Sequence, residues 1–154
     1  MPIRGGEGTG GGSSSTALRR AKLRQGRKPV IFLDTSVLVE ALGAGGSLRT
    51  TFREVIMEGR RMAIPSLVLY EWLRGPRHPE ELAAQEALFP AKGAIPFGPE
   101  EAELAAELYR TVSRPRGREL DLAISATALT WKATLWTLNV KDFGDIPGLR
   151  LRGR

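Results

Sequence analysis

Three acidic residues occupy places in the sequence that solvation alone does not explain: Asp34, Glu71 and Asp121. Asp34 follows directly on the apolar run Val30 to Leu33, and Glu71 lies inside a largely apolar segment. Asp121 opens a stretch with no other charge until Lys132. A carboxylate in such surroundings must be paired, hydrogen-bonded or bound to metal. The simpler alternative for Asp34 and Asp121 is helix capping, because Asp is favoured at the N-cap and in the first helical turn.

If the three carboxylates converge on one crevice they repel one another, and a divalent cation is the usual remedy. The sequence has no Cys and a single His, His78, so the ligands of such a cation would be oxygen atoms. Oxygen ligands favour Mg²⁺ or Mn²⁺ over zinc. Hard cations held by carboxylates suit phosphate chemistry, because they neutralise phosphoryl oxygens and activate a water molecule.

The apolar pattern predicts the scaffold that positions these acids. Short apolar or β-rich runs predict strands, and longer segments with apolar residues at helical spacing predict helices. The strands are expected at 30–33, 62–65, 94–97, 133–138 and 149–151, and the helices at 35–42, 47–61, 66–73, 80–89, 99–112 and 119–131. This order predicts an α/β fold, a three-layer α/β/α sandwich with a mostly parallel central sheet. Asp34 would then lie at the carboxyl end of a central strand, where open α/β sheets bind ligands.

The charge distribution divides the chain into two parts. The 154 residues carry a net charge of +6, yet residues 29–154 are neutral, so the positive charge lies in residues 1–28. Residues 1–16 are mostly Gly, Ser and Thr and are expected to be disordered, whereas residues 18–28 are basic and could form a helix on a polyanion. The alternative is an unselected extension or a start codon upstream of the true one. We expect a disordered tail at 1–28, a folded domain at 29–154 and, without a membrane span or signal peptide, a cytoplasmic protein.

Four segments together resemble a known family: Phe32 to Ser36, Glu71 to Gly75, Asp121 to Leu129 and Thr137 to Phe143. In this order and spacing they resemble the PIN-domain ribonucleases, most closely the VapC-type toxins of bacterial toxin–antitoxin pairs. The resemblance runs from Val30 to about Leu151. It implies a metal-dependent endoribonuclease that hydrolyses phosphodiester bonds in RNA.

The resemblance also implies roles for the acids. Asp34, Glu71 and Asp121 would be catalytic, with Asp34 and Asp121 as direct ligands of Mg²⁺ or Mn²⁺. Glu71 would bind a second metal ion or orient the attacking water. Some relatives carry a fourth acid where this chain has Asn139, and Asp142 either supplies that charge or caps the following turn. The number of metal ions stays open for this reason.

Further side chains would support the site. Thr35 or Ser36 would hydrogen-bond a metal-bound water or the scissile phosphate, and Thr137 would line the same pocket. Three basic residues just before Asp121 either grip the RNA backbone or form a solvated loop: Arg114, Arg116 and Arg118. The tryptophans either stack on bases or belong to the core, and these are Trp72, Trp131 and Trp136.

By resemblance the partners are the RNA substrate, a cognate antitoxin that plugs the acidic site, and a second copy of the chain. Exposed apolar residues on the predicted helices 47–61, 66–73 and 80–89 would form the dimer interface. A phosphatase with Asp34 as nucleophile is disfavoured, because that chemistry usually needs a second Asp where this chain has Ser36. A non-catalytic RNA-binding or protein-interaction module is disfavoured because it has little use for a repulsive acidic cluster.

Overall fold

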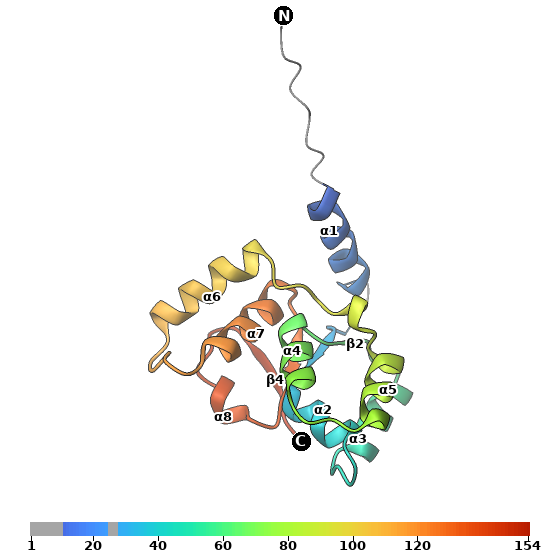
Figure 1. The fold of residues 1–154 in the computed structure, drawn as a ribbon. Helices are drawn as coiled ribbons and strands as arrows, with labels where there is room; N and C mark the ends of the chain where they lie inside the picture. Colours follow the sequence, from blue (N-terminus) through green and yellow to red (C-terminus); the bar gives the residue numbers. More distant parts are fainter. Residues whose placement is uncertain (1–10, 25–27) are drawn as a thin grey trace, which may run out of the picture.

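A computed structural model describes residues 11–24 and 28–154, with one four-stranded sheet among them (Figure 1). Its strands are all parallel, in the order β2-β1-β3-β4. They are β1 (Ile31–Leu33), β2 (Met62–Ala63), β3 (Thr134–Trp136) and β4 (Arg150–Arg152). The strands of each neighbouring pair therefore end at the same edge of the sheet, which brings the residues that follow them together.

Helices connect and cover these strands. They are α1 (Gly11–Arg24), α2 (Thr35–Leu42), α3 (Arg49–Met57), α4 (Ser66–Arg74), α5 (Pro79–Leu88), α6 (Pro99–Thr111), α7 (Glu119–Thr130) and α8 (Val140–Phe143), with a short 3₁₀ turn at Ala91–Gly93. Within the described ranges, no helix is both long and apolar enough to cross a membrane.

The central strand shows that helices cover both faces of the sheet. Ile31, Phe32 and Leu33 are all fully buried. Because successive side chains of a strand point to opposite faces, both faces must be packed. This confirms the predicted α/β fold with a parallel central sheet. Helix α7 is buried over most of its length, from Leu122 to Ala128, as its nearly continuous apolar sequence predicts.

The three tryptophans lie in the core and not on an RNA-binding surface. Trp72 and Trp136 are 0% exposed and Trp131 is 1% exposed. The alternative of base stacking is therefore wrong for the described structure. Each ring is instead covered by an arginine side chain, from Arg77, Arg152 and Arg20 respectively.

Two elements differ from the sequence prediction. Residues 94–97 were expected to form a strand, but only a single parallel bridge joins Pro65 and Ile95. Pro96 has no N–H with which to continue the ladder. Residues 141–144 were expected to form a turn, but helix α8 covers Val140–Phe143.

The basic tail also differs from its prediction, over residues 11–24. These residues form helix α1, whereas disorder was expected for residues 11–16 and a helix only on a polyanion for residues 18–24. Its Arg20 side chain forms ion pairs with Glu100 and Glu101 of α6, and Arg19 donates to the carbonyl oxygen of Gly93. Residues 1–10 and 25–27 of the predicted tail lie outside the described residues.

Candidate active site

Asp34 occupies the position that the strand pattern predicts, directly after β1. It is 4% exposed, and its backbone N–H donates to the carbonyl oxygen of Trp136 at 2.9 Å. Although Asp34 is the N-cap residue of α2, its side chain makes no capping hydrogen bond. Its Oδ2 atom instead accepts hydrogen bonds from the hydroxyls of Ser36 and Thr137, each at 2.8 Å. Helix capping therefore does not account for this carboxylate.

The two hydroxyls that hold Asp34 are themselves oriented by the backbone. Ser36 Oγ accepts from the N–H of Leu138 at 3.0 Å, and Thr137 Oγ1 accepts from the N–H of Asn139 at 3.0 Å. Each hydroxyl thus has its proton directed at Oδ2 of Asp34. Among the described residues no donor is bonded to Oδ1, so this oxygen is available for a ligand.

Glu71 reaches the same region from α4. The hydroxyl of Thr35 donates to its Oε1 at 3.0 Å, and Arg74 Nη2 lies 3.7 Å from its Oε2. Burial raises the pKa of Glu71 and the charge of Asp34 raises it further, against the lowering effects of Thr35 and Arg74. The effect of Asp34 on this pKa places the two carboxylates within electrostatic range of each other.

Asp121 lies in the first turn of α7, and no described residue donates a hydrogen bond to its carboxylate. Its pKa is raised to about 6, first by burial and then by the charges of Asp34, Glu71 and Asp142, with Arg118 opposing. An acid whose pKa is raised by other acids lies in a region of concentrated negative charge. The structure thus places Asp34, Glu71 and Asp121 within electrostatic range of one another.

The donor set fits a hydrated hard cation. Within the described part of the chain, no three acidic or histidine side chains are grouped closely enough to hold one ion between them. Mg²⁺ does not need such a cage, because it usually keeps several waters and binds through one or two carboxylates. Asp34 and Asp121 offer oxygen donors of this kind, and a cation would offset the repulsion that raises the pKa of Asp121.

Comparison with known proteins identifies the family. The family model for the PIN domain matches residues 31–149. The chain belongs to the PIN domain family. Ribonuclease VapC19 of Mycobacterium tuberculosis is 34% identical over 120 residues, covering 77% of this chain and 95% of the relative.

Solved structures share the fold. The structure of DNA-bound VapBC from Salmonella typhimurium has a TM-score of 0.60 at 24% identity and covers 80% of this chain and 96% of that chain. VapBC2 from Rickettsia felis bound to a promoter DNA fragment has a TM-score of 0.57 at 23% identity and covers 81% of this chain and 98% of that chain.

Two further polar residues of this PIN domain lie on or next to α8, the amide Asn139 and the acid Asp142. Asn139 is the N-cap residue of α8, Asp142 lies within that helix, and both are exposed. Asp142 raises the pKa of Asp121, so its charge reaches the site from α8. The position of Asn139 adds an amide and no charge.

The three predicted RNA-binding arginines separate into two kinds. Arg114 and Arg116 are exposed in the loop before α7, and Arg114 has a positive φ of 56°. Arg118 is different, because its guanidinium donates to both carboxylate oxygens of Asp145. Sequence reasoning missed Asp145, since nothing in the local pattern links it to a residue 27 positions earlier.

Proposed function

We propose that this PIN domain is a metal-dependent endoribonuclease, the toxin of a type II toxin–antitoxin pair. The observation that carries the proposal is the convergence of Asp34, Glu71 and Asp121. The charges of the other two acids raise the pKa of Asp121, and Glu71 accepts a hydrogen bond from Thr35, the residue after Asp34. The similarity to a protein named ribonuclease supports RNA as the substrate. A repulsive cluster of acids has a clear use in phosphodiester hydrolysis and little use in a passive binding module.

Asp34 and Asp121 are the residues that would hold the cation, Mg²⁺ or Mn²⁺. When bound, it supplies charge stabilisation of the phosphoryl oxygens and a water that is more readily deprotonated. Ser36 and Thr137 fix the orientation of Asp34 through its Oδ2, so that the ligand oxygen needs little rearrangement. Such prior orientation is how a protein lowers the free-energy cost of the reacting geometry.

Glu71 and the exposed arginines complete the proposed site. Thr35 holds Glu71 through Oε1, and Oε2, which lies 3.7 Å from Arg74 Nη2, would orient the attacking water. Arg114 and Arg116 are placed to contact RNA phosphates on either side of the cut, because they are exposed next to the α7 terminus that carries Asp121. Asn139 can orient a water through its amide, and Asp142 adds negative charge from α8.

Cleavage of total RNA tests the proposal. The purified protein is incubated with Mg²⁺, with Mn²⁺ or with EDTA, beside Asp34→Ala and a matched control, Glu107→Ala, which removes an exposed acid on α6. We expect discrete fragments that need the metal, persist in the control and disappear with Asp34→Ala. Metal-independent fragments, or full cleavage by Asp34→Ala, would refute it; RNA binding without cleavage would favour a non-catalytic module.

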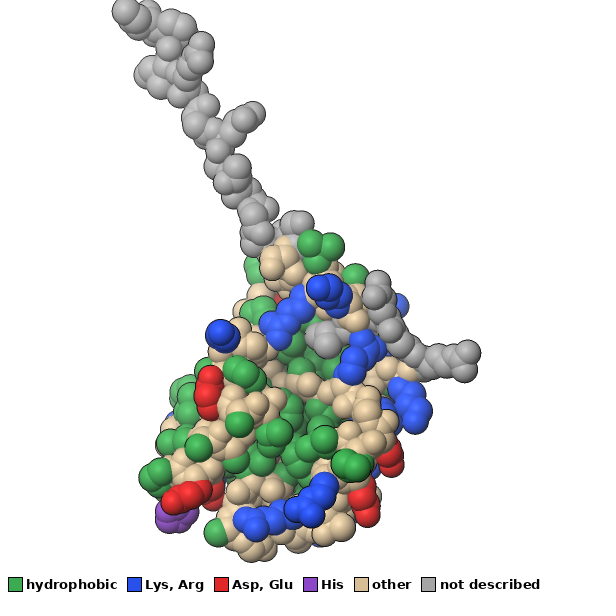
Figure 2. All heavy atoms as spheres, turned by 90° about the vertical axis from the view of Figure 1, so that its right-hand side faces the viewer, with side chains coloured by type: hydrophobic (Ala, Val, Ile, Leu, Met, Phe, Trp, Pro, Cys, Tyr) green, Lys and Arg blue, Asp and Glu red, His purple; other side chains and the backbone are tan. Residues whose placement is uncertain are grey.

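The proposed protein partners are an antitoxin and a second copy of the chain. Large apolar side chains are exposed on three helices that are adjacent in sequence: Ile56 and Met57 on α3, Tyr70 and Leu73 on α4, and Leu82 and Leu88 on α5. Figure 2 shows hydrophobic side chains across the middle of the face that carries α3 and α5. Such patches mark interaction surfaces. Light scattering on the parent and on Met57→Glu tests the dimer, which the charge should dissociate.

A further inference from the structure

Basic residues gather at the amino-terminal edge of the sheet, opposite the acids. We name this surface the amino edge; its residues are Lys28, Arg60, Arg61, Lys132 and Arg150, which precede or begin the four strands. Because neighbouring strands lie about 4.8 Å apart, the four strand starts fall within about 15 Å of one another. On the face in Figure 2, most Lys and Arg side chains lie in the upper half.

Backbone contacts confirm that the amino edge is continuous. The N–H of Ile31 donates to the carbonyl of Arg61 at 2.9 Å, and the N–H of Thr134 donates to the carbonyl of Val30 at 2.9 Å. Thr134 in turn is in register with Arg150. The acid nearest along the chain is Glu58, which is exposed two residues before Arg60. In space, Glu101 of α6 accepts from Thr130, two residues before Lys132, and its charge is paired with Arg20.

Two arginines of the amino edge have buried donors without acceptors among the described residues. Arg60 Nε and Arg61 Nη2 are buried and have no hydrogen-bond partner there. Another nitrogen of Arg61, Nη1, donates to the carbonyl of Lys22 at 2.6 Å. A buried donor without an acceptor costs free energy. Each guanidinium also carries further N–H groups, and phosphate is one of the two anions that match its planar fork.

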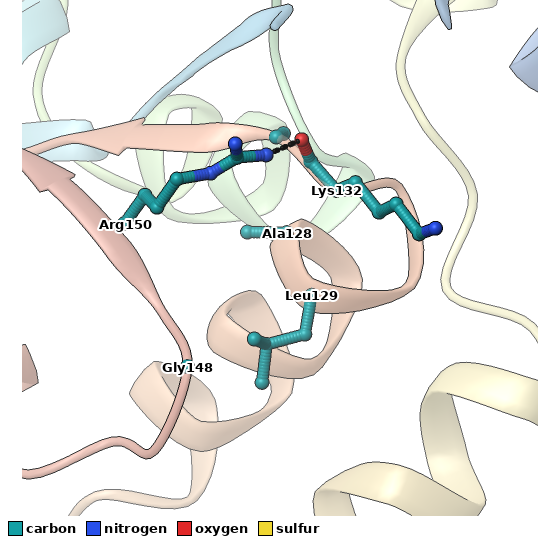
Figure 3. Close-up of a pocket in the computed structure, with 6 residues that line it drawn as sticks. Ala128, Leu129, Lys132, Gly148 and Arg150 are labelled. Carbon is teal, nitrogen blue, oxygen red and sulfur yellow. Dashed lines mark hydrogen bonds between the residues drawn. The ribbon is translucent and has the colours of Figure 1, made fainter.

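Lys132 lies in a backbone conformation that favours glycine. Its φ is 52°, and it follows Trp131 at the end of α7, the position where helices commonly place Gly. Arg150 donates to the carbonyl of Lys132 and holds this turn (Figure 3). In the described chain, only Arg114 shares a positive φ among non-glycine residues. The chain thus keeps a cation at 132 where a glycine would be less strained.

Between Lys132 and Arg150 lies a hollow of about 360 Å³. It is lined by Ala128, Leu129, Lys132, Ala133, Gly148 and Arg150. Figure 3 shows Leu129 of α7 on one side and the β4 segment with Gly148 and Arg150 on the other. The volume is at the small end of the range for ligand pockets. Figure 3 shows the side chain of Lys132 extending away from Arg150. The apolar lining suits a ribose or base, with its phosphate beside one of the two cations.

We propose that the amino edge is a second RNA-contacting surface, which holds the phosphate backbone of the substrate away from the point of cleavage. This inference rests on the proposed function, because it takes RNA as the substrate. The acids and the amino edge lie at opposite ends of strands of two or three residues, which are at most about 10 Å long. An RNA segment of several nucleotides that runs over the surface is long enough to reach both. Lys132 and Arg150 are the central contacts, with Arg60 and Arg61 beside them.

RNA binding without cleavage tests the inference. Fluorescence anisotropy is measured with a 5′-fluorescein-labelled 20-nucleotide RNA, single-stranded and as a hairpin, in EDTA and in the Asp34→Ala background. We expect Lys132→Gln with Arg150→Gln to raise the Kd about tenfold at 0.1 M salt. The slope of log K against log salt should become shallower by about 1.4 for the single strand, about 0.7 for each lost phosphate contact. Arg53→Gln with Lys92→Gln removes two exposed cations elsewhere and should change the Kd less than twofold.

Lys132→Gly distinguishes the effect of the Lys132 charge on RNA affinity from an effect on the stability of the fold. Gly relieves the positive φ and keeps the carbonyl that Arg150 binds, so the Tm should rise by about 2–4 °C while RNA affinity falls. An unchanged Kd in the Lys132 and Arg150 variants, an equal loss in the Arg53 and Lys92 control, or no RNA binding by the parent would overturn the inference. Loss of affinity in this assay, together with no RNA cleavage by the parent in Mg²⁺ or Mn²⁺, would support the inference and refute the proposed nuclease.

Discussion

Arg118 and Asp145 form a bidentate ion pair, with Nη1 to Oδ2 at 2.8 Å and Nη2 to Oδ1 at 2.6 Å. The same Nη2 also donates to the carbonyl oxygen of Asp142 at 2.7 Å. Arg118 is the N-cap residue of α7, so the guanidinium joins the start of that helix to the segment around α8. Because Asp121 is on α7 and Asp142 is on α8, we infer that this ion pair helps to hold the two carboxylates in their relative positions.

We predict that Arg118 positions the site and does not grip RNA. Arg118→Lys loses the planar fork, and Asp145→Asn weakens its partner, so each should lower RNA cleavage about tenfold. The double variant Arg118→Ala with Asp145→Ala should cleave RNA no more slowly than the less active of the two single Ala variants, since both residues act through one contact. Steady-state kinetics check this. If Arg118→Ala raises KM while Asp145→Ala has no effect, Arg118 is instead an RNA contact. Arg116→Ala serves as the comparison, because loss of an RNA contact there should raise KM.

Asp121 should make the protein less stable at high pH. Its folded pKa, about 6, is above its ordinary value because burial and neighbouring acids disfavour its charge. The folded state therefore binds more protons than the unfolded state between about pH 4 and 6, and stability falls as pH rises through that window. Above it the penalty is constant.

Asp121→Asn should remove that penalty. In EDTA we expect the variant to be more stable than the parent at pH 8 by about 1 kcal/mol, a value discounted for the partial exposure of the site. At pH 5 the gain should be smaller, and RNA cleavage should be lost at both values. Urea denaturation at the two pH values measures this. A gain that is equal at pH 5 and pH 8 would contradict the assigned cause.

Thr137→Val should destabilise the protein and impair cleavage together. Valine keeps the shape of threonine but removes a hydroxyl that donates to Asp34 and accepts from Asn139 N–H. Losing a hydrogen bond to a charged, buried group costs about 1.5–3 kcal/mol. Thr111→Val is the matched control, because that hydroxyl bonds carbonyls of its own helix at an exposed site. Denaturant titration should show a loss below about 1 kcal/mol for the control.

The parts of the fold that the sequence predicts are those with a strong local signal. The unbroken run Val30 to Leu33 predicts β1, and the acid that follows it predicts the edge where ligands bind. Asp34 is recognisable because it follows an apolar run, Glu71 because it is the only acid in an apolar segment, and Asp121 because an uncharged stretch follows it. Parallel topology explains the position of Asp34 at a strand end. Glu71 and Asp121 reach the same region from α4 and α7.

The parts that the sequence does not predict depend on distant partners. The pairing of Arg118 with Asp145 needs the packing of α8 near α7, which no periodicity encodes. Residues 94–97 have a β-rich composition, yet Pro96 and the position of Ile95 beside Pro65 allow only one bridge. Helix α1 was unexpected because its Gly- and Ser-rich sequence has weak helix propensity, and its contacts with α6 are also distant.

Helix α1 should contribute to stability through Arg20. Glu101 is 3% exposed, and its carboxylate accepts from Arg20, the Thr130 hydroxyl and the Gly98 N–H. Removing one partner of a buried ion pair leaves an uncompensated charge. Arg20→Ala should therefore lower the free energy of unfolding by about 2 kcal/mol, a value below that for fully buried pairs because Arg20 is partly exposed.

A second substitution identifies the source of that loss. Glu101→Gln removes the buried charge, so adding Arg20→Ala to it should cost clearly less than Arg20→Ala costs alone. Arg19→Ala is the matched control on the same helix, since Arg19 donates to a backbone carbonyl, that of Gly93. Thermal and urea denaturation of the parent, the two single variants and the double variant close this double-mutant cycle. If Arg20→Ala costs as much in the Glu101→Gln protein as in the parent, the contribution of Arg20 to stability does not come from the buried charge of Glu101.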